Sequence, residues 1–100
     1  MTEKLTEREI AHHLETLNKL AKDDMWVIVN GKLHKQFKFK SFIRAFGWMS
    51  QIAIWAEKLK HHPEWFNVYN TVKVDLVTHD VGGISELDFQ LATKMETFKS

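Results

Sequence analysis

The sequence has no cysteine, a single proline, four glycines and almost no net charge. The absence of cysteine excludes disulfide bonds and thiolate zinc sites. A formal net charge of +1, from 14 basic and 13 acidic residues, argues against direct binding of nucleic acid. No apolar run approaches the ~18 residues of a membrane span, and the N-terminal MTEKLTERE does not resemble a cleavable signal peptide. We therefore expect an intracellular protein, cytoplasmic and also nuclear, with no direct contact to nucleic acid or membrane.

What is present is typical of one globular domain. The 100 residues are 44% hydrophobic and 27% charged, which suits one core but not two. No linker, low-complexity segment or repeat interrupts the chain. We expect residues 1–100 to form a single domain.

Capping signals and helical periodicity predict three helices. Thr6 with Glu9, and Ser85 with Asp88, have the spacing of capping boxes, and Ser41 suits an N-cap. The first helix has an apolar face of Ile10, Leu14, Leu17 and Ala21; the second runs from Phe42 to about Leu59; the last carries Leu91, Ala92, Met95 and Phe98.

Two hairpins are predicted between the helices. Asn30-Gly31 is a two-residue turn signal that joins strands over 25–30 and 32–39. After Pro63, a short strand over 66–69 and a longer strand over 71–78 meet at a turn containing Asn70. The order is a helix, then two hairpins each followed by a helix. It predicts an α+β fold of two layers, a four-stranded antiparallel sheet with helices packed on one face.

The stretch EKLKHHPEWF sets two histidines against the only proline. Pro63 forbids further helix and biases His62 toward an extended conformation, so His61 and His62 leave the helix end in different directions. His79 follows the long strand, and Glu57 stands one helical turn before His61, where it could orient that ring. The matched pair, His12 and His13, has no proline nearby and suits a solvated helix surface.

The residues alone leave three roles open for His61, His62 and His79. An imidazole can donate or accept a proton near neutral pH, which suits acid–base catalysis or a ligand site. Three histidines with a carboxylate could also bind zinc, although the chain lacks the HExxH spacing that sets two ligands on one helical face. Histidines near a helix C-terminus also interact favourably with its dipole without any further function.

The region from Glu57 to Asp88 resembles the pterin-4a-carbinolamine dehydratases. The family pattern is an acidic residue, His-His-Pro, an aromatic residue, a histidine and an aspartate, and seven positions fall on it in register: Glu57, His61, His62, Pro63, Tyr69, His79 and Asp88. The match extends upstream through KQFKFKSFIRAFGWM. Two positions depart from many animal members, Lys60 where an acid is often found and Leu87 where an arginine is common.

The resemblance implies dehydration of 4a-hydroxytetrahydrobiopterin to quinonoid dihydrobiopterin, within tetrahydrobiopterin recycling. By similarity, His61 and His79 are acids and His62 binds and orients the pterin, with no metal and no cofactor. Asp88 could orient a histidine or simply cap its helix, and Trp65 could bound the pterin ring or belong to the core. The implied substrate-binding set is Glu57, Lys60, His61, His62, Pro63, Trp65, Val77, Thr78, His79, Asp80 and Asp88.

A second hypothesis concerns the helix from Phe42 to Leu59. Between Phe42 and Ala56 it has one charged residue, Arg44, and is apolar almost all round, which predicts burial on more than its sheet face. The family resemblance implies a homotetramer, a dimer of dimers, and a coactivator role as dimerisation cofactor of a homeodomain transcription factor. The predicted interface residues are Phe42, Ile43, Phe46, Trp48, Met49, Ile52 and Trp55.

Overall fold

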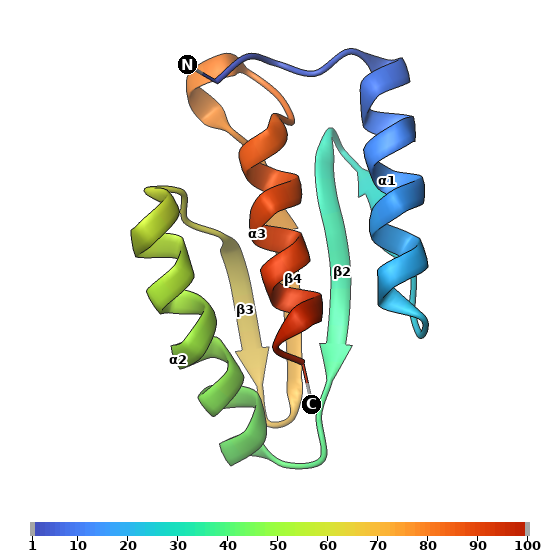
Figure 1. Ribbon diagram of the computed structural model, residues 1–100. Coiled ribbons are helices and arrows are strands. Elements are labelled where there is room, and N and C mark those ends of the chain that lie inside the picture. The colour runs from blue at the N-terminus through green and yellow to red at the C-terminus, as the bar shows by residue number, and fades with distance from the viewer. Residues whose placement is uncertain (1, 100) are drawn as a thin grey trace.

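The computed structural model describes residues 2–99 and confirms the predicted order of elements. The elements are α1 (Glu7–Ala21), β1 (Val27–Val29), β2 (Lys32–Lys38), α2 (Phe42–Leu59), β3 (Glu64–Val68), β4 (Thr71–Leu76), the short 3-10 helix η1 (His79–Val81) and α3 (Glu86–Thr97). The four strands form one antiparallel sheet in the order β1-β2-β4-β3. The three helices lie on one face of this sheet, with α3 between α1 and α2 (Figure 1).

Local signals fix the helix starts where the sequence predicts them. Thr6 with Glu9 and Ser85 with Asp88 both form capping boxes, and the Ser41 hydroxyl accepts a hydrogen bond from the Arg44 backbone N–H. The ends of the strands depart further from the predicted ones than the helix starts do. The long strand stops at Leu76 instead of continuing to Thr78, because the chain turns into η1, whose C-cap Gly82 adopts a left-handed φ of 70°.

The sheet presents one apolar face to the helices. The inward side chains of β2 and β4, Leu33, Phe37, Val72, Val74 and Leu76, are buried as predicted. The same alternation also buries Lys35, a charged residue. Its ammonium lies 2.5 Å from Glu96 Oε2 of α3, so the core contains a charged pair.

Part of the interface predicted on α2 is wrong, because some of its residues are buried within the same chain. Trp48 and Ile52 are buried against the protein's own core, and the Trp48 indole N–H donates to the Met95 carbonyl. Met49 and Trp55 are partly buried and pack on the same core. The large apolar side chains that α2 leaves exposed are Phe42, Ile43, Phe46 and Ile54. The helix is therefore apolar on two faces, but only one of them is available to another chain.

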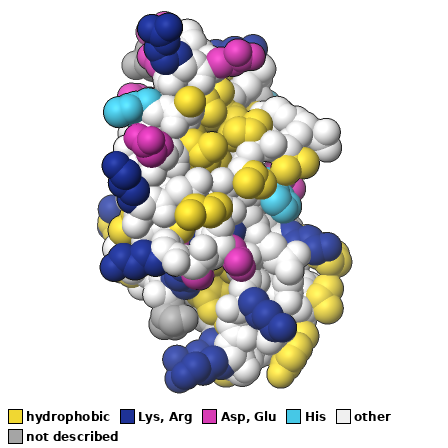
Figure 2. Space-filling model, turned by 90° about the vertical axis from the view of Figure 1, so that its right-hand side faces the viewer, with side chains coloured by type: hydrophobic (Ala, Val, Ile, Leu, Met, Phe, Trp, Pro, Cys, Tyr) yellow, Lys and Arg dark blue, Asp and Glu magenta, His cyan; other side chains and the backbone are white. Residues whose placement is uncertain are grey.

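A second exposed apolar region lies at the edge of the sheet that β1 forms. All three residues of β1, Val27, Ile28 and Val29, are exposed, as are Met25 just before this strand and Leu20 near the end of α1. Figure 2 views the molecule from this side and shows hydrophobic side chains gathered on the surface. Among residues 2–99, no helix has the length and apolar character needed to span a membrane.

Candidate active site

Four chain segments meet at one end of the molecule, the upper end in Figure 1. There α2 ends, β3 begins, β4 runs into η1, and α3 starts. Between them lies a hollow of about 240 Å³, lined by Lys60, His61, His62, Val77, Thr78, His79 and Asp80. The structure thus brings together all three predicted histidines, although they are up to 18 positions apart in the sequence.

The end of α2 separates the two adjacent histidines. Lys60 adopts a left-handed φ of 53°, and its N–H bonds to carbonyls of the preceding turn, which stops the helix. His61 then turns inward and is buried, whereas the His62 side chain is 64% exposed. The predicted divergence of the two rings is confirmed. One imidazole forms the floor of the hollow and the other forms its rim.

Asp88 is the hydrogen-bond partner of the buried histidine, His61. His61 Nε2 lies 2.5 Å from Asp88 Oδ1. The other carboxylate oxygen, Oδ2, accepts from the Ser85 backbone N–H at 2.9 Å and the Thr78 hydroxyl at 2.9 Å. Asp88 therefore caps α3 and contacts the histidine at the same time, each with its own oxygen. The structure thus contains both contacts that the sequence left open for Asp88, one with a histidine and one with the start of its helix.

Glu57 contacts a different histidine from the expected one. Its Oε2 lies 2.8 Å from His62 Nε2, and both side chains are exposed. The helical spacing of four residues from Glu57 to His61 would hold only if α2 continued. Because Lys60 terminates the helix, His61 points into the protein and His62 takes the position near Glu57.

His79 has a partner that the sequence did not indicate. Its Nε2 lies 2.9 Å from Glu64 Oε2, and Lys32 donates to Glu64 Oε1 at 2.6 Å. The hydrogen bond from Lys32, together with that from His79, lowers the pKa of Glu64 below its ordinary value. Glu64 follows Pro63 directly, so the turn that ends α2 also supplies a carboxylate for the histidine of another segment.

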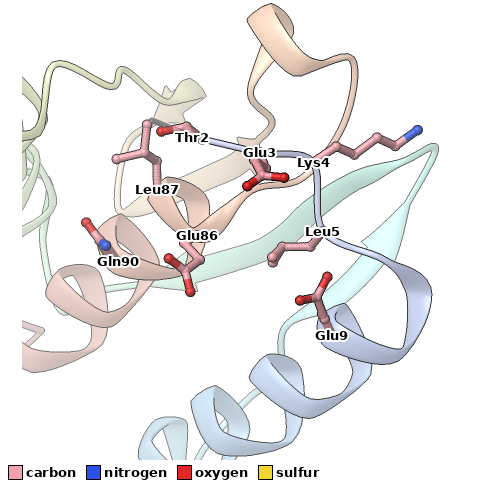
Figure 3. A pocket seen from close by; sticks show the side chains of 8 residues that line it. All are labelled: Thr2, Glu3, Lys4, Leu5, Glu9, Glu86, Leu87 and Gln90. Carbon is pink, nitrogen blue, oxygen red and sulfur yellow. The ribbon is translucent and has the colours of Figure 1, made fainter.

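Other predicted residues lie outside the hollow. Trp65 packs against the core, with its ring 6.2 Å from that of Trp48, which favours the core interpretation. Tyr69 is an exposed residue in the β3–β4 turn. Leu87 faces a separate hollow of about 280 Å³ beside the N-terminal segment, whose lining is mostly polar and includes Glu3, Glu9 and Glu86 (Figure 3). None of the histidines lines that second hollow.

The three histidines that line the hollow do not share a carboxylate partner. Each of the three rings is paired with a separate carboxylate, from Glu57, Glu64 or Asp88. Within residues 2–99, no group of three or more histidine or acidic side chains is arranged to hold a metal ion. Imidazoles of this kind, on the floor and rim of a small hollow, are suited to moving protons on a bound molecule.

This fold and site define a small α+β domain with a hollow lined by three histidines. Its similarity to known proteins is specific. A profile of the family described as pterin 4 alpha carbinolamine dehydratase matches residues 3–98. The chain therefore belongs to the pterin-4-alpha-carbinolamine dehydratase family. Since dehydratases are hydro-lyases, the expectations of family and enzyme class are confirmed.

Relatives and a solved structure agree with the family assignment. A protein of Jannaschia sp. named as a pterin-4-alpha-carbinolamine dehydratase is 55% identical over 98 residues, covering 96% of each chain. Another of that name from Solibacter usitatus is 52% identical over 96 residues, covering 96% of this chain and 95% of its own. A crystal structure of a transcriptional coactivator/pterin dehydratase from Brucella melitensis superposes with a TM-score of 0.88 at 46% identity, covering 98% of this chain and 100% of that one.

Proposed function

We infer that this protein dehydrates 4a-hydroxytetrahydrobiopterin to quinonoid dihydrobiopterin and so takes part in tetrahydrobiopterin recycling. The observation that carries the proposal is the convergence of His61, His62 and His79 on one hollow of about 240 Å³. Family membership supplies the substrate class. Lys60 and residues 77–80 line the same hollow. In this proposal their backbone polar groups bind the edge of the pterin.

The chemistry needs a proton donor and a proton acceptor. As the C4a–O bond breaks, its electron pair leaves with the hydroxyl oxygen, which an imidazolium protonates so that water departs. The neighbouring ring nitrogen, N5, loses its proton to a base or to water. His61 and His79 are the acids in this proposal, and His62 binds and orients the ring. Positioned proton transfer of this kind contributes roughly a hundredfold to ten-thousandfold. No resident metal or cofactor takes part in this proposal.

The direct test is a stopped-flow measurement of 4a-carbinolamine decay with and without the purified protein. The protein should accelerate decay in proportion to its concentration, and the product should have the absorbance of quinonoid dihydropterin. A decay rate independent of protein concentration would contradict the proposal. Varying the side chain of the pterin in the same assay identifies the preferred substrate.

A second function, a coactivator role, is favoured by the exposed face of α2. Ile43, Phe46 and Ile54 present apolar side chains to solvent on a helix of 18 residues. Such a surface suits another amphipathic helix. The occupants in this proposal are a second copy of the chain and the dimerisation segment of a homeodomain transcription factor. The Brucella melitensis structure, described as a coactivator as well as a dehydratase, adds support.

The homotetramer in this proposal is a dimer of dimers. A tetramer of that symmetry needs two different self-complementary surfaces on each chain. The exposed face of α2 is one candidate, and the exposed apolar strand β1 at the opposite edge of the sheet is the other. A partner segment would compete for α2, so binding of a labelled segment should rise as the tetramer dissociates. Nuclear as well as cytoplasmic localisation belongs to this coactivator role, and imaging of a tagged chain tests it.

A further inference from the structure

The buried hydroxyl groups of Ser85 and Thr78 form a series of hydrogen bonds that ends at the carboxylate of Asp88, the partner of His61. Thr78 Oγ1 donates to Asp88 Oδ2 at 2.9 Å and lies 2.6 Å from Ser85 Oγ. A hydroxyl has one proton to donate, and that of Thr78 is committed to Asp88. The Ser85 hydroxyl must therefore donate to Thr78 Oγ1, while it accepts from the Leu87 backbone N–H at 3.2 Å. Every hydrogen bond in this series is donated in the direction of Asp88.

This arrangement leaves one oxygen of Asp88 for the histidine. Oδ2 already accepts from the Thr78 hydroxyl and the Ser85 backbone N–H. Oδ1 contacts His61 Nε2 at 2.5 Å, and the Asp88 side chain is fully buried. A carboxylate is an acceptor only, so His61 must donate from Nε2. The proton of neutral His61 is then fixed on Nε2.

The other ring nitrogen of His61 opens to the hollow. No protein atom among residues 2–99 forms a hydrogen bond with His61 Nδ1, and no buried side-chain nitrogen or oxygen in this part of the chain lacks a partner. Nδ1 is therefore accessible, and the hollow is what His61 lines. The ring thus has its protonated edge against Asp88 and its free edge toward the hollow.

We propose that the Thr78 and Ser85 hydroxyls are positioning groups that, through Asp88, make Nδ1 the atom by which His61 exchanges protons with the substrate. The inference rests on the proposed dehydratase function. Protonated His61 donates its Nδ1 proton to the 4a-hydroxyl as the C4a–O bond breaks and water leaves. His61 then remains neutral with its proton on Nε2, and the N5 proton passes to solvent or base. One proton is released for each proton consumed.

The tautomer can be tested without any catalytic assay. Two-bond ¹H–¹⁵N correlation spectra of the ring-labelled protein distinguish Nε2–H from Nδ1–H in each neutral histidine. At a pH where His61 is neutral, its Nε2 should carry the proton in the intact protein. A proton on Nδ1 would overturn the inference, whatever the activity of the enzyme.

Substitutions then test the role of the hydroxyls. Thr78→Val keeps the shape of the side chain and removes its proton donor, and Thr78→Ser restores the donor. We expect Thr78→Val to lower kcat about tenfold, the effect of one hydrogen bond to a charged group, with little change in KM, and to mix the two tautomers of His61. Thr78→Ser should recover both signals. Ser85→Ala removes the outer donor and also the hydroxyl that caps α3. It should show a smaller loss of kcat than Thr78→Val, together with some loss of stability.

Thr93→Val is the matched control, because the Thr93 hydroxyl donates to a backbone carbonyl within α3 and does not contact the site. It should leave kcat and the His61 tautomer unchanged.

Full activity in His61→Ala would refute the proposed function itself. An inactive His61→Ala alongside a Thr78→Val with normal kcat and an unmixed Nε2–H tautomer would refute only the positioning role. Equal losses in Thr78→Val and Thr78→Ser would also refute it.

Discussion

Lys35 and Glu96 form an ion pair inside the core, with Lys35 Nζ 2.5 Å from Glu96 Oε2 and each side chain only 1% exposed. The Trp26 indole N–H donates to the same oxygen at 2.9 Å, and Asp23 Oδ1 accepts from Lys35 at 3.0 Å. The pair therefore connects strand β2 to helix α3 and to the loop before β1. Its charges are compensated, and removing one of them leaves the other buried.

We predict that Lys35→Met lowers the free energy of unfolding by about 3–5 kcal/mol, the usual effect of breaking a buried pair. Urea unfolding monitored by tryptophan fluorescence measures it. Lys35→Met with Glu96→Gln should recover part of the loss, because the glutamine is neutral and can still accept from Trp26. Lys73→Met, at an exposed lysine of the neighbouring strand, is the control and should stay within about 0.5 kcal/mol of the unmodified protein. Equal effects at both lysines would contradict the buried-pair argument.

We also predict a specific acid sensitivity of this network. Burial raises the pKa of Asp23, but hydrogen bonds from Lys99 and Lys35 outweigh it, so its pKa lies below the ordinary value. A lowered folded-state pKa adds stability above the unfolded pKa, and this contribution is lost as the pH falls through the folded pKa. The unmodified protein should therefore lose more stability than Asp23→Asn between about pH 5 and pH 2.5.

The neighbouring Asp24 is an exposed matched control for this titration. Asp24→Asn should follow the pH dependence of the unmodified protein in urea unfolding at each pH. The inference about Asp23 would be wrong if Asp23→Asn left the dependence of unfolding free energy on pH unchanged on the acid side.

Lys99 makes a contribution to stability that depends on pH on the alkaline side. Burial lowers the pKa of Lys99, but the hydrogen bonds that it donates to Asp23 and Glu96 raise this pKa above the ordinary value. Its contribution to stability therefore holds below the unfolded pKa and is lost as the pH rises through the folded pKa.

The elements of the fold could be predicted because their signals are local. Capping boxes at Thr6 and Ser85, the Asn30-Gly31 turn and the alternation through Val72, Val74 and Leu76 each depend on residues a few positions apart. Lys35 shows where this reasoning fails. Its position in the alternation faces the core, but only the distant Glu96, Asp23 and Trp26 make burial of a charge tolerable. Local pattern does not indicate such partners.

All seven residues that line the hollow belong to the predicted set, but the pairing of the histidines could not be predicted. Four members of that set do not line the hollow: Glu57, Pro63, Trp65 and Asp88. The resemblance to a family named the histidines, and the hollow contains all three. Which carboxylate each one meets depends on where α2 stops and how η1 turns. Spacing along an ideal helix suggested Glu57 for His61, whereas the left-handed Lys60 gives His61 to Asp88. Glu64 could have been noticed only as the acid that follows His-His-Pro.

We predict that His61→Ala and His79→Ala each lower dehydratase activity at least about tenfold, because each removes a proton donor. His79 is exposed, so its substitution should leave thermal stability unchanged. His61→Ala leaves Asp88 Oδ1 buried without its partner and should cost about 1–3 kcal/mol of stability as well. Stopped-flow rates and thermal unfolding of the same samples separate the two effects.

His12→Ala is the control, since His12 is an exposed residue of α1. It should keep full activity and stability. His13 is a poorer control, because its ring lies 5.2 Å from that of Phe89 and is partly covered. Losses of the same size in His12→Ala and the site variants would refute the assignment.

We predict that activity does not depend on a metal. The site histidines are each paired with a different carboxylate, and proton transfer by imidazole needs no Lewis acid. Incubation with a chelator followed by gel filtration should leave the stopped-flow rate unchanged, and elemental analysis should find no stoichiometric metal. One zinc ion per chain whose removal abolishes turnover, and whose return restores it, would reverse this conclusion.

Self-association through α2 should depend on the apolar side chains that this helix leaves exposed. Ile43 is 74% exposed on this helix, whereas Ile52 is fully buried in the core of its own chain. Burying a large apolar side chain is worth about 1.5–3 kcal/mol, so a charge at Ile43 or Phe46 should weaken any interface that covers them. A charge at Ile52 should instead unfold the domain, because an isolated buried carboxylate has no partner there.

Light scattering of Ile43→Glu, Phe46→Glu and Thr16→Glu tests this argument. The two α2 variants should have a lower mass than the unmodified protein while their thermal unfolding and turnover per chain change little. Thr16→Glu adds the same charge to an exposed position of α1 and should keep the original mass. An unmodified protein that is monomeric at micromolar concentration would show that solvent, not another chain, covers this face. Loss of folding in Ile43→Glu would show that the two faces of α2 are not independent.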